Sequence, residues 1–276
     1  LNAENGDEET IYIKPADSVK KVAVIGAGIA GLEAARVAAK RGHKVVLFEK
    51  EDKIGGQIHL AAVPPRKSEI LRAVTYYEKI LPVLGVELRL HTIPDAQELN
   101  QYDVVIAAVG AHNMELPMPA ENSHVVSSWD VLNGADVSGT CVVLGGGLVG
   151  TETAEYLAEK GNKVIIVEML DKIAAGESAT VMPLITKDFE AHGVEQHVNT
   201  KVKEIRDNVI YAVHTKDGTE VTISADTIVN ALGSKKNVFD ESGITAQITY
   251  VGDCSGEHTA DIAAAVRSGY HAANGI

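Results

Sequence analysis

Three glycines and a glutamate form the strongest chemical signal in the sequence. Residues 26–31 read GAGIAG, and Glu49 follows 18 residues after the last of these glycines. In a dinucleotide-binding turn, Gly26 permits the tight turn, Gly28 lets the backbone approach a pyrophosphate, and Gly31 lets helix and strand pack closely. A carboxylate at the position of Glu49 accepts hydrogen bonds from a ribose 2′-OH. The pattern predicts a nucleotide site.

The flanking residues supply the elements that such a site requires. An apolar run at 22–25 precedes the glycines, an Ala-rich amphipathic segment follows them, and a second apolar run at 45–48 leads to Glu49. This order is strand, turn, helix and strand. The N-terminus of the helix offers unpaired N–H groups and a positive dipole end to phosphates. The alternative left open is a plain βαβ unit with a glycine-rich turn.

The same pattern returns 119 residues later without a gap. The corresponding glycines are Gly145, Gly147 and Gly150, and the corresponding acid is Glu168. Further residues of the first copy that are identical to the residue 119 positions later are Glu33, Ala35, Gly42, Lys44, Val45, Asp52, Lys53 and Ile54. An internal repeat of this kind predicts two dinucleotide-binding folds and hence two nucleotides.

The two copies differ just after the acid, where Gly55-Gly56 stands in the first and Ala174-Ala175 in the second. Adjacent glycines suggest backbone that runs close to a ligand, although an ordinary loop is the alternative. A C-terminal strand over 248–251, followed by Gly252-Asp253, and a helix over 259–274 would complete the first fold. The first copy is therefore the better FAD site.

The second copy is interpreted as an inserted NADH-binding module. Glu168 is followed by Met169 and Leu170, so no arginine stands there to meet a 2′-phosphate, and a carboxylate would repel that group. NADH is therefore favoured over NADPH. Glu152, placed in the first turn of the second helix, could contact a nicotinamide amide. Its alternative role is to complement the helix dipole.

Two adjacent nucleotides without an evident nucleophile, metal cluster or carboxylate pair indicate redox chemistry between cofactors. A hydride would pass from the nicotinamide C4 to the flavin N5, a step that needs stacking and exclusion of water. No catalytic side chain and no metal site are therefore expected. His59, His91 and His112 could flank a flavin, but packing or surface roles are the alternative.

Composition limits the possible partners. The chain has 276 residues and a net charge of −13, which argues against nucleic acid and anionic membranes as partners. No apolar run approaches the length of a membrane span. Cys141 and Cys254 form no CxxC pair, so a reducing, cytoplasmic setting is expected. The chain starts with Leu rather than Met, which suggests a piece of a longer chain.

These observations predict an α/β protein of two interleaved Rossmann-like domains, each with a parallel sheet. Residues 1–20 are expected to be a tail or linker. Residues 21–115 and 237–276 would form the FAD-binding domain, and residues 116–236 the NADH-binding domain. Three alternating stretches within 200–224 predict an inserted three-stranded β-meander.

The sequence resembles the two-dinucleotide-binding-domain flavoproteins, whose fold is glutathione-reductase-like. The turn DKIGGQ at 52–57, followed by AAVPP at 61–65, looks like the C-terminal half of the enoate reductase, 2,4-dienoyl-CoA reductase and trimethylamine dehydrogenase family. Residues 1–8 are similar to the segment that follows the last iron–sulfur cysteine in that family.

The resemblance implies an NADH:flavin oxidoreductase module of a larger enzyme. An N-terminal TIM-barrel partner domain in the same longer chain would hold FMN and a [4Fe–4S] cluster, and would receive electrons from NADH through FAD. The residues that carry over to FAD are Gly26, Gly28, Gly31, Glu49, Gly55, Gly56, Gln57, Gly110 and Asp253, with Thr259 at the start of the last helix. The residues that carry over to NADH are Gly145, Gly147, Gly150, Glu168 and Gly233, with Glu152.

Two rival functions remain. In one, the chain is a non-catalytic module that keeps only an ADP-type ligand, as some trimethylamine dehydrogenase-like members do. In the other, it is a disulfide reductase, against which the absence of a CxxC pair argues strongly.

Overall fold

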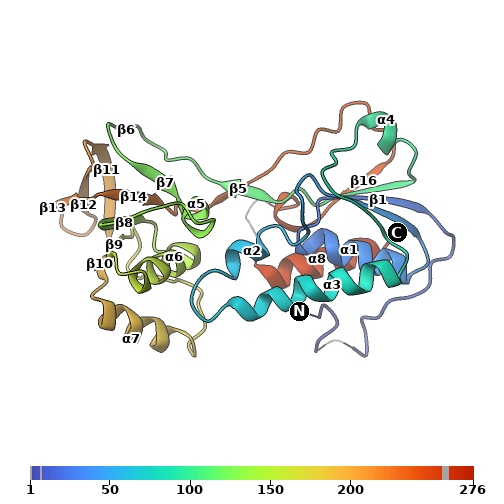
Figure 1. The fold of residues 1–276 in the computed structure, drawn as a ribbon, viewed down its shortest axis with the longest axis horizontal. Coiled ribbons are helices and arrows are strands. Elements are labelled where there is room, and N and C mark those ends of the chain that lie inside the picture. Colours follow the sequence, from blue (N-terminus) through green and yellow to red (C-terminus); the bar gives the residue numbers. More distant parts are fainter. Residues whose placement is uncertain (1, 7, 257–260) are drawn as a thin grey trace. The chain divides into compact units, whose positions relative to one another are not determined.

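The computed structural model describes residues 2–6, 8–256 and 261–276. The chain divides into two compact units (Figure 1). Unit 1 comprises Leu1–Ala62, Glu69–His112 and Lys235–Ile276, and unit 2 comprises Val63–Ser68 and Asn113–Ser234. The short segment Val63–Ser68 was expected in the FAD-binding domain, but it packs with unit 2.

Unit 1 is built on a five-stranded parallel sheet with the strand order β16-β4-β1-β2-β3. The strands are β1 (Lys21–Ile25), β2 (Lys44–Phe48), β3 (Glu87–Arg89), β4 (Val104–Ala107) and β16 (Gln247–Tyr250). The helices of this part of the chain are α1 (Ile29–Lys40), α2 (Ile58–Ala61), η1 (Ser68–Ile70), α3 (Leu71–Val83), α4 (Ala96–Leu99), η2 (Gly252–Cys254) and α8 (Ile262–Asn274). Because β1 lies between β2 and β4, its carboxyl end is the topological switch point at which such sheets bind ligands.

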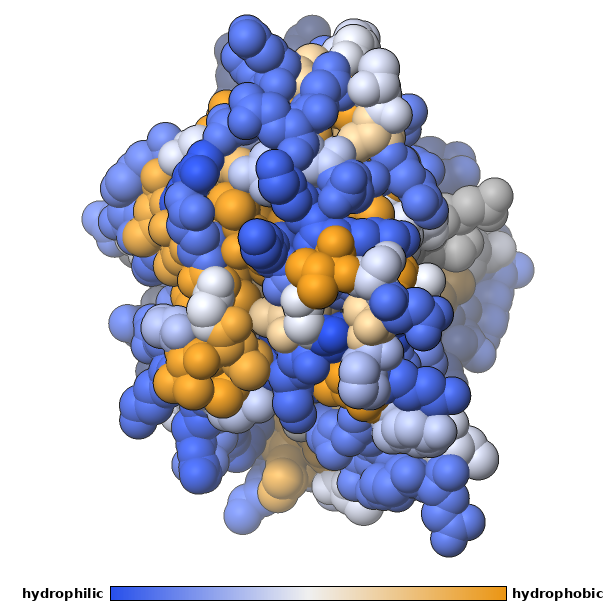
Figure 2. Space-filling model, turned by 90° about the vertical axis from the view of Figure 1, so that its right-hand side faces the viewer, coloured by the Kyte–Doolittle hydropathy of each residue, from blue (hydrophilic) through white to orange (hydrophobic). Residues whose placement is uncertain are grey.

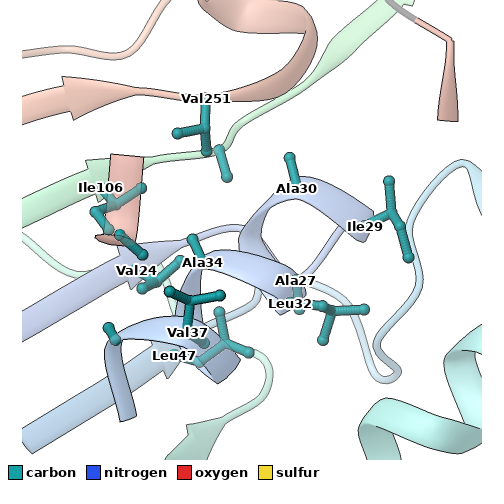
Figure 3. Packing of buried hydrophobic residues seen from close by; sticks show 14 of the residues in the cluster. Val24, Ala27, Ile29, Ala30, Leu32, Ala34, Val37, Leu47, Ile106 and Val251 are labelled. Carbon is teal, nitrogen blue, oxygen red and sulfur yellow. The ribbon is translucent and has the colours of Figure 1, made fainter. Parts of the chain in front are cut away.

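The Ala-rich sequence of α1 allows this helix to approach its neighbours closely. Figure 3 shows Ala34 of α1 beside the buried strand residue Val24. A Cβ at Gly269 of α8 would lie 2.1 Å from the carbonyl oxygen of Ala30, so the two helices cross almost backbone to backbone. Small residues on α1 therefore fix the depth at which the glycine turn sits against the sheet.

Unit 2 repeats this plan with a five-stranded parallel sheet in the order β10-β9-β8-β14-β7. Its strands are β7 (Val125–Ser127), β8 (Thr140–Leu144), β9 (Lys163–Val167), β10 (Glu195–His197) and β14 (Thr227–Asn230), and its helices are α5 (Ser128–Leu132), α6 (Leu148–Glu159) and α7 (Met182–His192). The carboxyl end of β8, between β9 and β14, is the second switch point.

The predicted meander is present in unit 2. Strands β11 (Thr200–Arg206), β12 (Val209–His214) and β13 (Glu220–Ser224) pair antiparallel, and β6 (Ala120–Glu121) extends their sheet. The short strands β5 (Ala111–Asn113) and β15 (Ser234–Lys236) lie where the chain passes between the units. The fold class expected from the sequence is confirmed.

The N-terminal residues are not a free tail in the part that the structure describes. Ala3 is 3% exposed and belongs to the core of unit 1, and Ile11 and Ile13 pack against the same core. The Tyr270 hydroxyl donates a hydrogen bond of 2.9 Å to Glu4. Apolar side chains at 3, 11 and 13 thus dock a segment for which the sequence predicts a tail or linker.

The face of the molecule seen in Figure 2 is mostly polar. Figure 2 shows hydrophilic residues over much of the viewed face, with apolar residues in separate groups between them. Within residues 2–6, 8–256 and 261–276, no helix combines the length and apolar character that crossing a membrane requires.

Candidate nucleotide-binding sites

The first and third glycines of each turn are required by the fold itself. Gly26 has φ +97°, and a Cβ there would lie 2.5 Å from the carbonyl oxygen of Ala108. A Cβ at Gly31 would lie 1.9 Å from the carbonyl oxygen of Gly26. In unit 2, Gly145 has φ +99°, and a Cβ at Gly150 would lie 1.9 Å from the carbonyl oxygen of Gly145. These glycines allow helix, turn and strand to meet without steric overlap.

The middle glycines have a different reason to be glycine. Gly28 and Gly147 are the N-cap residues of α1 and α6, with φ of −69° and −65°, which any residue adopts. A Cβ at either position would meet no atom within 4 Å. Neither helix start receives a side-chain cap hydrogen bond. Each turn therefore leaves open space and uncapped N–H groups where a pyrophosphate fits.

The two acids are held in the same way. Glu49 Oε2 accepts a hydrogen bond of 2.6 Å from the N–H of Ala27, and Oε1 accepts one of 3.0 Å from Glu51. Glu168 Oε2 accepts one of 2.6 Å from Gly146, and Oε1 accepts one of 2.7 Å from Leu170. Both carboxylates are thus fixed beside their glycine turn as acceptors, which is the geometry a ribose hydroxyl requires.

The glycine pair of unit 1 lies directly against the turn. The N–H of Gly55 donates to the carbonyl oxygen of Ala27 at 2.8 Å, and a Cβ at Gly56 would lie 3.1 Å from the Cα of Gly28. Their φ values are +113° and +50°. The sequence predicts that the backbone at Gly55-Gly56 runs close to a ligand. Its packing against the turn that would hold the pyrophosphate is consistent with that prediction.

Three further residues predicted for FAD come together in unit 1. Gln57 Nε2 donates a hydrogen bond of 2.9 Å to Asp253 Oδ2, and a Cβ at Gly110 would lie 3.6 Å from the same Gln57 nitrogen. Residues 196 positions apart thus form one polar group after β4 and β16. Thr259, also predicted for this site, lies outside the described residues.

Unit 2 keeps the loop but not its glycines. The N–H of Ala174 donates to the carbonyl oxygen of Gly146 at 2.6 Å, matching the bond between Gly55 and Ala27. Ala174 has φ +48°, a left-handed value that is costly for a residue with a Cβ. The loop path is therefore part of both copies, while the absence of side chains is particular to unit 1.

Glu152 lies close to its predicted position, but not in the first turn. Helix α6 begins at Leu148 and its first turn contains no acidic residue, so Glu152 follows that turn. Its carboxylate forms an ion pair with Lys67. Gly233, which follows β14 with φ +121°, accepts a hydrogen bond of 2.9 Å from the N–H of Met114.

The other titratable candidates have structural contacts. His59 Nε2 lies 2.8 Å from the carbonyl oxygen of Ile54, and His112 Nδ1 lies 2.7 Å from Asn237 Oδ1, while His91 is exposed. Cys141 and Cys254 are free and buried, and burial raises the pKa of the Cys141 thiol to about 11. The described residues contain no cluster of His, Cys, Asp or Glu suited to a metal ion.

The match to known proteins decides the family. Residues 20–251 match the model of the pyridine nucleotide-disulphide oxidoreductase family. The chain belongs to this family. It is 47% identical to the bilirubin reductase of Mediterraneibacter gnavus, over 99% of the chain and 43% of that protein. It is 38% identical to the NADH oxidase of Thermoanaerobacter brockii, over 96% of the chain and 42% of that protein.

A solved structure agrees with these relatives. The structure of 2-naphthoyl-CoA reductase with 2-naphthoyl-CoA superposes with a TM-score of 0.90 at 30% identity, covering 100% of this chain and 43% of that one. The resemblance to the C-terminal half of such reductases is therefore confirmed. The chain spans less than half the length of these relatives. Membership implies an oxidoreductase module that binds FAD and NAD(P)H, and the uncapped helix starts and fixed acids fit both nucleotides.

Sequence reasoning missed the side chains that act over long separations. Arg66 forms ion pairs with Glu155 and Asp188, which lie 89 and 122 positions away. Asn237 donates from Nδ2 to the carbonyl oxygen of Val109 at 2.7 Å and so holds the turn at Gly110. Neither residue belongs to a motif, so only the folded chain reveals these contacts.

Proposed function

We propose that this chain is the electron-input module of a longer reductase. Unit 1 binds FAD, unit 2 binds NADH, and electrons pass from NADH through FAD to an N-terminal TIM-barrel domain that carries FMN and a [4Fe–4S] cluster. The observation that carries the proposal is the pair of matching turns, each with an uncapped helix start and an acid fixed by two backbone N–H groups.

The difference between the loops supports the assignment of each nucleotide. In unit 1, Gly55 and Gly56 remove side chains beside Gly28, and Gln57 and Asp253 add a polar group. Such a group suits the longer, polyhydroxylated chain of FAD, because a ribityl chain needs hydrogen-bond partners beyond the pyrophosphate. Unit 2 has alanines in its loop at 174–175. These methyl groups suit a nucleotide that, like NADH, needs less backbone contact beside the glycine turn than FAD does.

The side chains position and select rather than react. When bound, the nicotinamide supplies a hydride and the flavin accepts it. Glu49 and Glu168 each orient a ribose, while the helix starts at Gly28 and Gly147 stabilise the phosphates. Gln57 holds the Asp253 carboxylate in place for a hydroxyl of FAD.

The carboxylate of Glu168 favours NADH over NADPH. It is held by the N–H groups of Gly146 and Leu170, so it cannot turn away from a 2′-phosphate without losing both bonds. The neighbouring Met169 and Leu170 carry no charge to compensate. A phosphate on this ribose would be repelled.

Glu168→Ala tests this assignment. Losing hydrogen bonds to a charged acceptor should weaken NADH binding about tenfold, while NADPH binding changes less, so that the preference for NADH narrows. The measurement is the dissociation constant of each nucleotide by titration calorimetry, with the exposed Glu159→Ala as control. Identical ratios before and after the change would exclude Glu168 as the ribose acid.

Flavin content tests the whole proposal. The purified chain should be yellow, should hold one FAD, and should be bleached by NADH without oxygen. A colourless protein that rejects added FAD would instead support the rival function, a nucleotide-binding module that keeps an ADP-type ligand.

The partner domain and the compartment are part of the same proposal. The relatives contain more than half of their length beyond the matched region, which leaves room for a TIM-barrel domain. Free, buried thiols suit a reducing cytoplasm and give a disulfide reductase no exposed pair to use. Joining the chain to such a domain should restore NADH-dependent reduction of an acceptor that neither part reduces alone.

A further inference from the structure

The six-residue segment Val63–Ser68, here called the strap, carries two cations to unit 2. The chain on both sides of the strap belongs to unit 1, yet the strap itself packs within unit 2. Arg66 forms ion pairs with Glu155 of α6 and Asp188 of α7, the latter at 2.5 Å between Nη1 and Oδ2. The adjacent Lys67 forms its ion pair with Glu152.

The carboxylate of Glu155 needs such a partner. Its side chain is 5% exposed, and that of Asp188 is 27% exposed. Burial and the neighbouring Asp188 carboxylate raise the pKa of Glu155, and Arg66 opposes this shift. A planar guanidinium can bind two carboxylates from two helices at once, which a lysine ammonium does with less geometric definition.

The backbone of Arg66 has an unfavourable, left-handed conformation. Its φ is +65°, in the left-handed region that residues with a Cβ avoid. Pro64 and Pro65 precede it and restrict the ways in which the chain could relieve this strain. A strained residue of this kind persists where the surrounding contacts fix it, and here the two ion pairs of Arg66 are those contacts.

Helix α6 itself, Leu148–Glu159, contains no lysine or arginine. Residues 113–159 contain no Lys or Arg. The corresponding helix of unit 1 differs, because Arg36 of α1 occupies the position that Glu155 occupies in α6 and pairs with Glu33 on the same helix. In unit 2 both positions are acidic, and the strap supplies the positive charge.

We propose that Arg66 is a positioning residue that locks the strap on unit 2, so that Lys67 neutralises Glu152 near the NADH phosphates. The strap thereby raises affinity for an anionic dinucleotide. This inference rests on the proposed NADH site only in its last step. With the strap released, Glu152, Glu155 and Asp188 face the ligand's charges without counter-ions.

Trypsin tests the lock without any nucleotide, because it cleaves after Arg66 and Lys67. The variant Glu155→Gln/Asp188→Asn keeps both cleavage sites but removes the charges that hold them. Cleavage of the full chain at these two bonds, followed by mass spectrometry, should be about tenfold faster than in the wild type, as expected when a segment opens more readily.

The matched control is Glu159→Gln/Glu190→Gln, which likewise replaces one carboxylate by an amide on each of α6 and α7, at exposed positions without an ion pair among the described residues. Its cleavage rate should equal that of the wild type. Equal rates in all three proteins would overturn the lock. If the double variant does not fold, Asp188→Asn alone provides the comparison, with a smaller increase expected.

NADH binding tests the consequence. Arg66→Gln should raise the dissociation constant of NADH about fivefold, as expected for the loss of a partly exposed charge pair, with FAD content unchanged. Arg66→Lys should recover part of the loss, and the exposed Lys187→Gln should have no effect. Faster trypsin cleavage with unchanged NADH affinity would overturn the positioning role. A wild type that binds no NADH would contradict the proposed function but not the lock.

Discussion

The two nucleotide units have the same turn geometry but neutralise the helix behind the turn differently. In α1, Glu33 and Arg36 pair bidentately at 2.7 Å, and the Tyr77 hydroxyl donates to Glu33 at 2.9 Å. All three side chains are buried. In α6, the positions equivalent to Glu33 and Arg36 are both acidic, and these residues, Glu152 and Glu155, pair with cations from the strap.

This difference separates what a dinucleotide turn requires from what surrounds it. The closest contacts that a Cβ would make at the first and third glycines, and the 2.6 Å hydrogen bond from the turn to the acid, are the same in both units, so they are the conditions for the site. The charge partners are not repeated. In unit 1 the buried acid is neutralised within one helix, whereas in unit 2 the acids are neutralised by residues far away in sequence.

Removing Arg36 should have the largest effect. Arg36→Met leaves the buried Glu33 carboxylate unpaired, which should cost about 3–5 kcal/mol of the free energy of unfolding. Lys67→Met should cost less than about 1 kcal/mol, because the Lys67 side chain is 39% exposed and its ion pair is screened. Urea unfolding measures both, with the exposed Arg72→Met as control. Equal losses for Arg36 and Lys67 would contradict the contrast between the units.

Alanine at the middle glycines should separate the two nucleotides. Gly28→Ala and Gly147→Ala add a Cβ where the protein has open space, so unfolding should change by no more than about 1 kcal/mol. A bound pyrophosphate would meet the new methyl group, and affinity should fall at least about tenfold. Flavin content should fall only for Gly28→Ala and NADH affinity only for Gly147→Ala. The reverse result would exchange the assignment of FAD and NADH.

Exchanging alanine and glycine between the two loops that follow the acids should change stability by smaller amounts, and in opposite directions in the two units. Ala174→Gly relieves a left-handed alanine and should stabilise the protein by about 1 kcal/mol. Gly55→Ala should destabilise it by a similar amount or more, since φ is +113° and the new Cβ would lie 2.8 Å from His59 Nε2. Thermal unfolding measures both changes. A destabilised Ala174→Gly would mean that its methyl group is needed for packing.

The sequence could predict the parts of the fold whose residues follow a pattern over a short stretch of the chain. Gly26 to Glu49 and Gly145 to Glu168 carry their turn, helix and acid within about two dozen residues, and the meander shows its own alternation. The pairing of Arg66 with Glu155 depends on how the whole chain folds, so no local sequence pattern predicts it. The same holds for Ala3, whose burial depends on a core made by other elements.

A smaller difference between the units concerns the loss of stability at low pH. His43, just before β2, is 6% exposed and accepts a hydrogen bond of 3.1 Å at Nδ1 from the N–H of Lys20. Burial lowers the pKa of His43, and Arg41 adds to the shift. The corresponding residue of unit 2 is Asn162, which does not titrate. Only unit 1 therefore has a proton-sensitive residue at this position.

The sign of the pH effect follows from the lowered pKa. Below the usual histidine value of about 6.5, the unfolded chain binds a proton that the folded chain resists, so stability is lost as the pH falls. The loss from one group cannot exceed about 1.4 kcal/mol per pH unit. His43→Asn, which introduces the residue of the second copy, should remove this part of the pH dependence. Thermal unfolding between pH 7 and 5 measures the difference between wild type and variant, and a difference that stays constant with pH would show that His43 does not carry it.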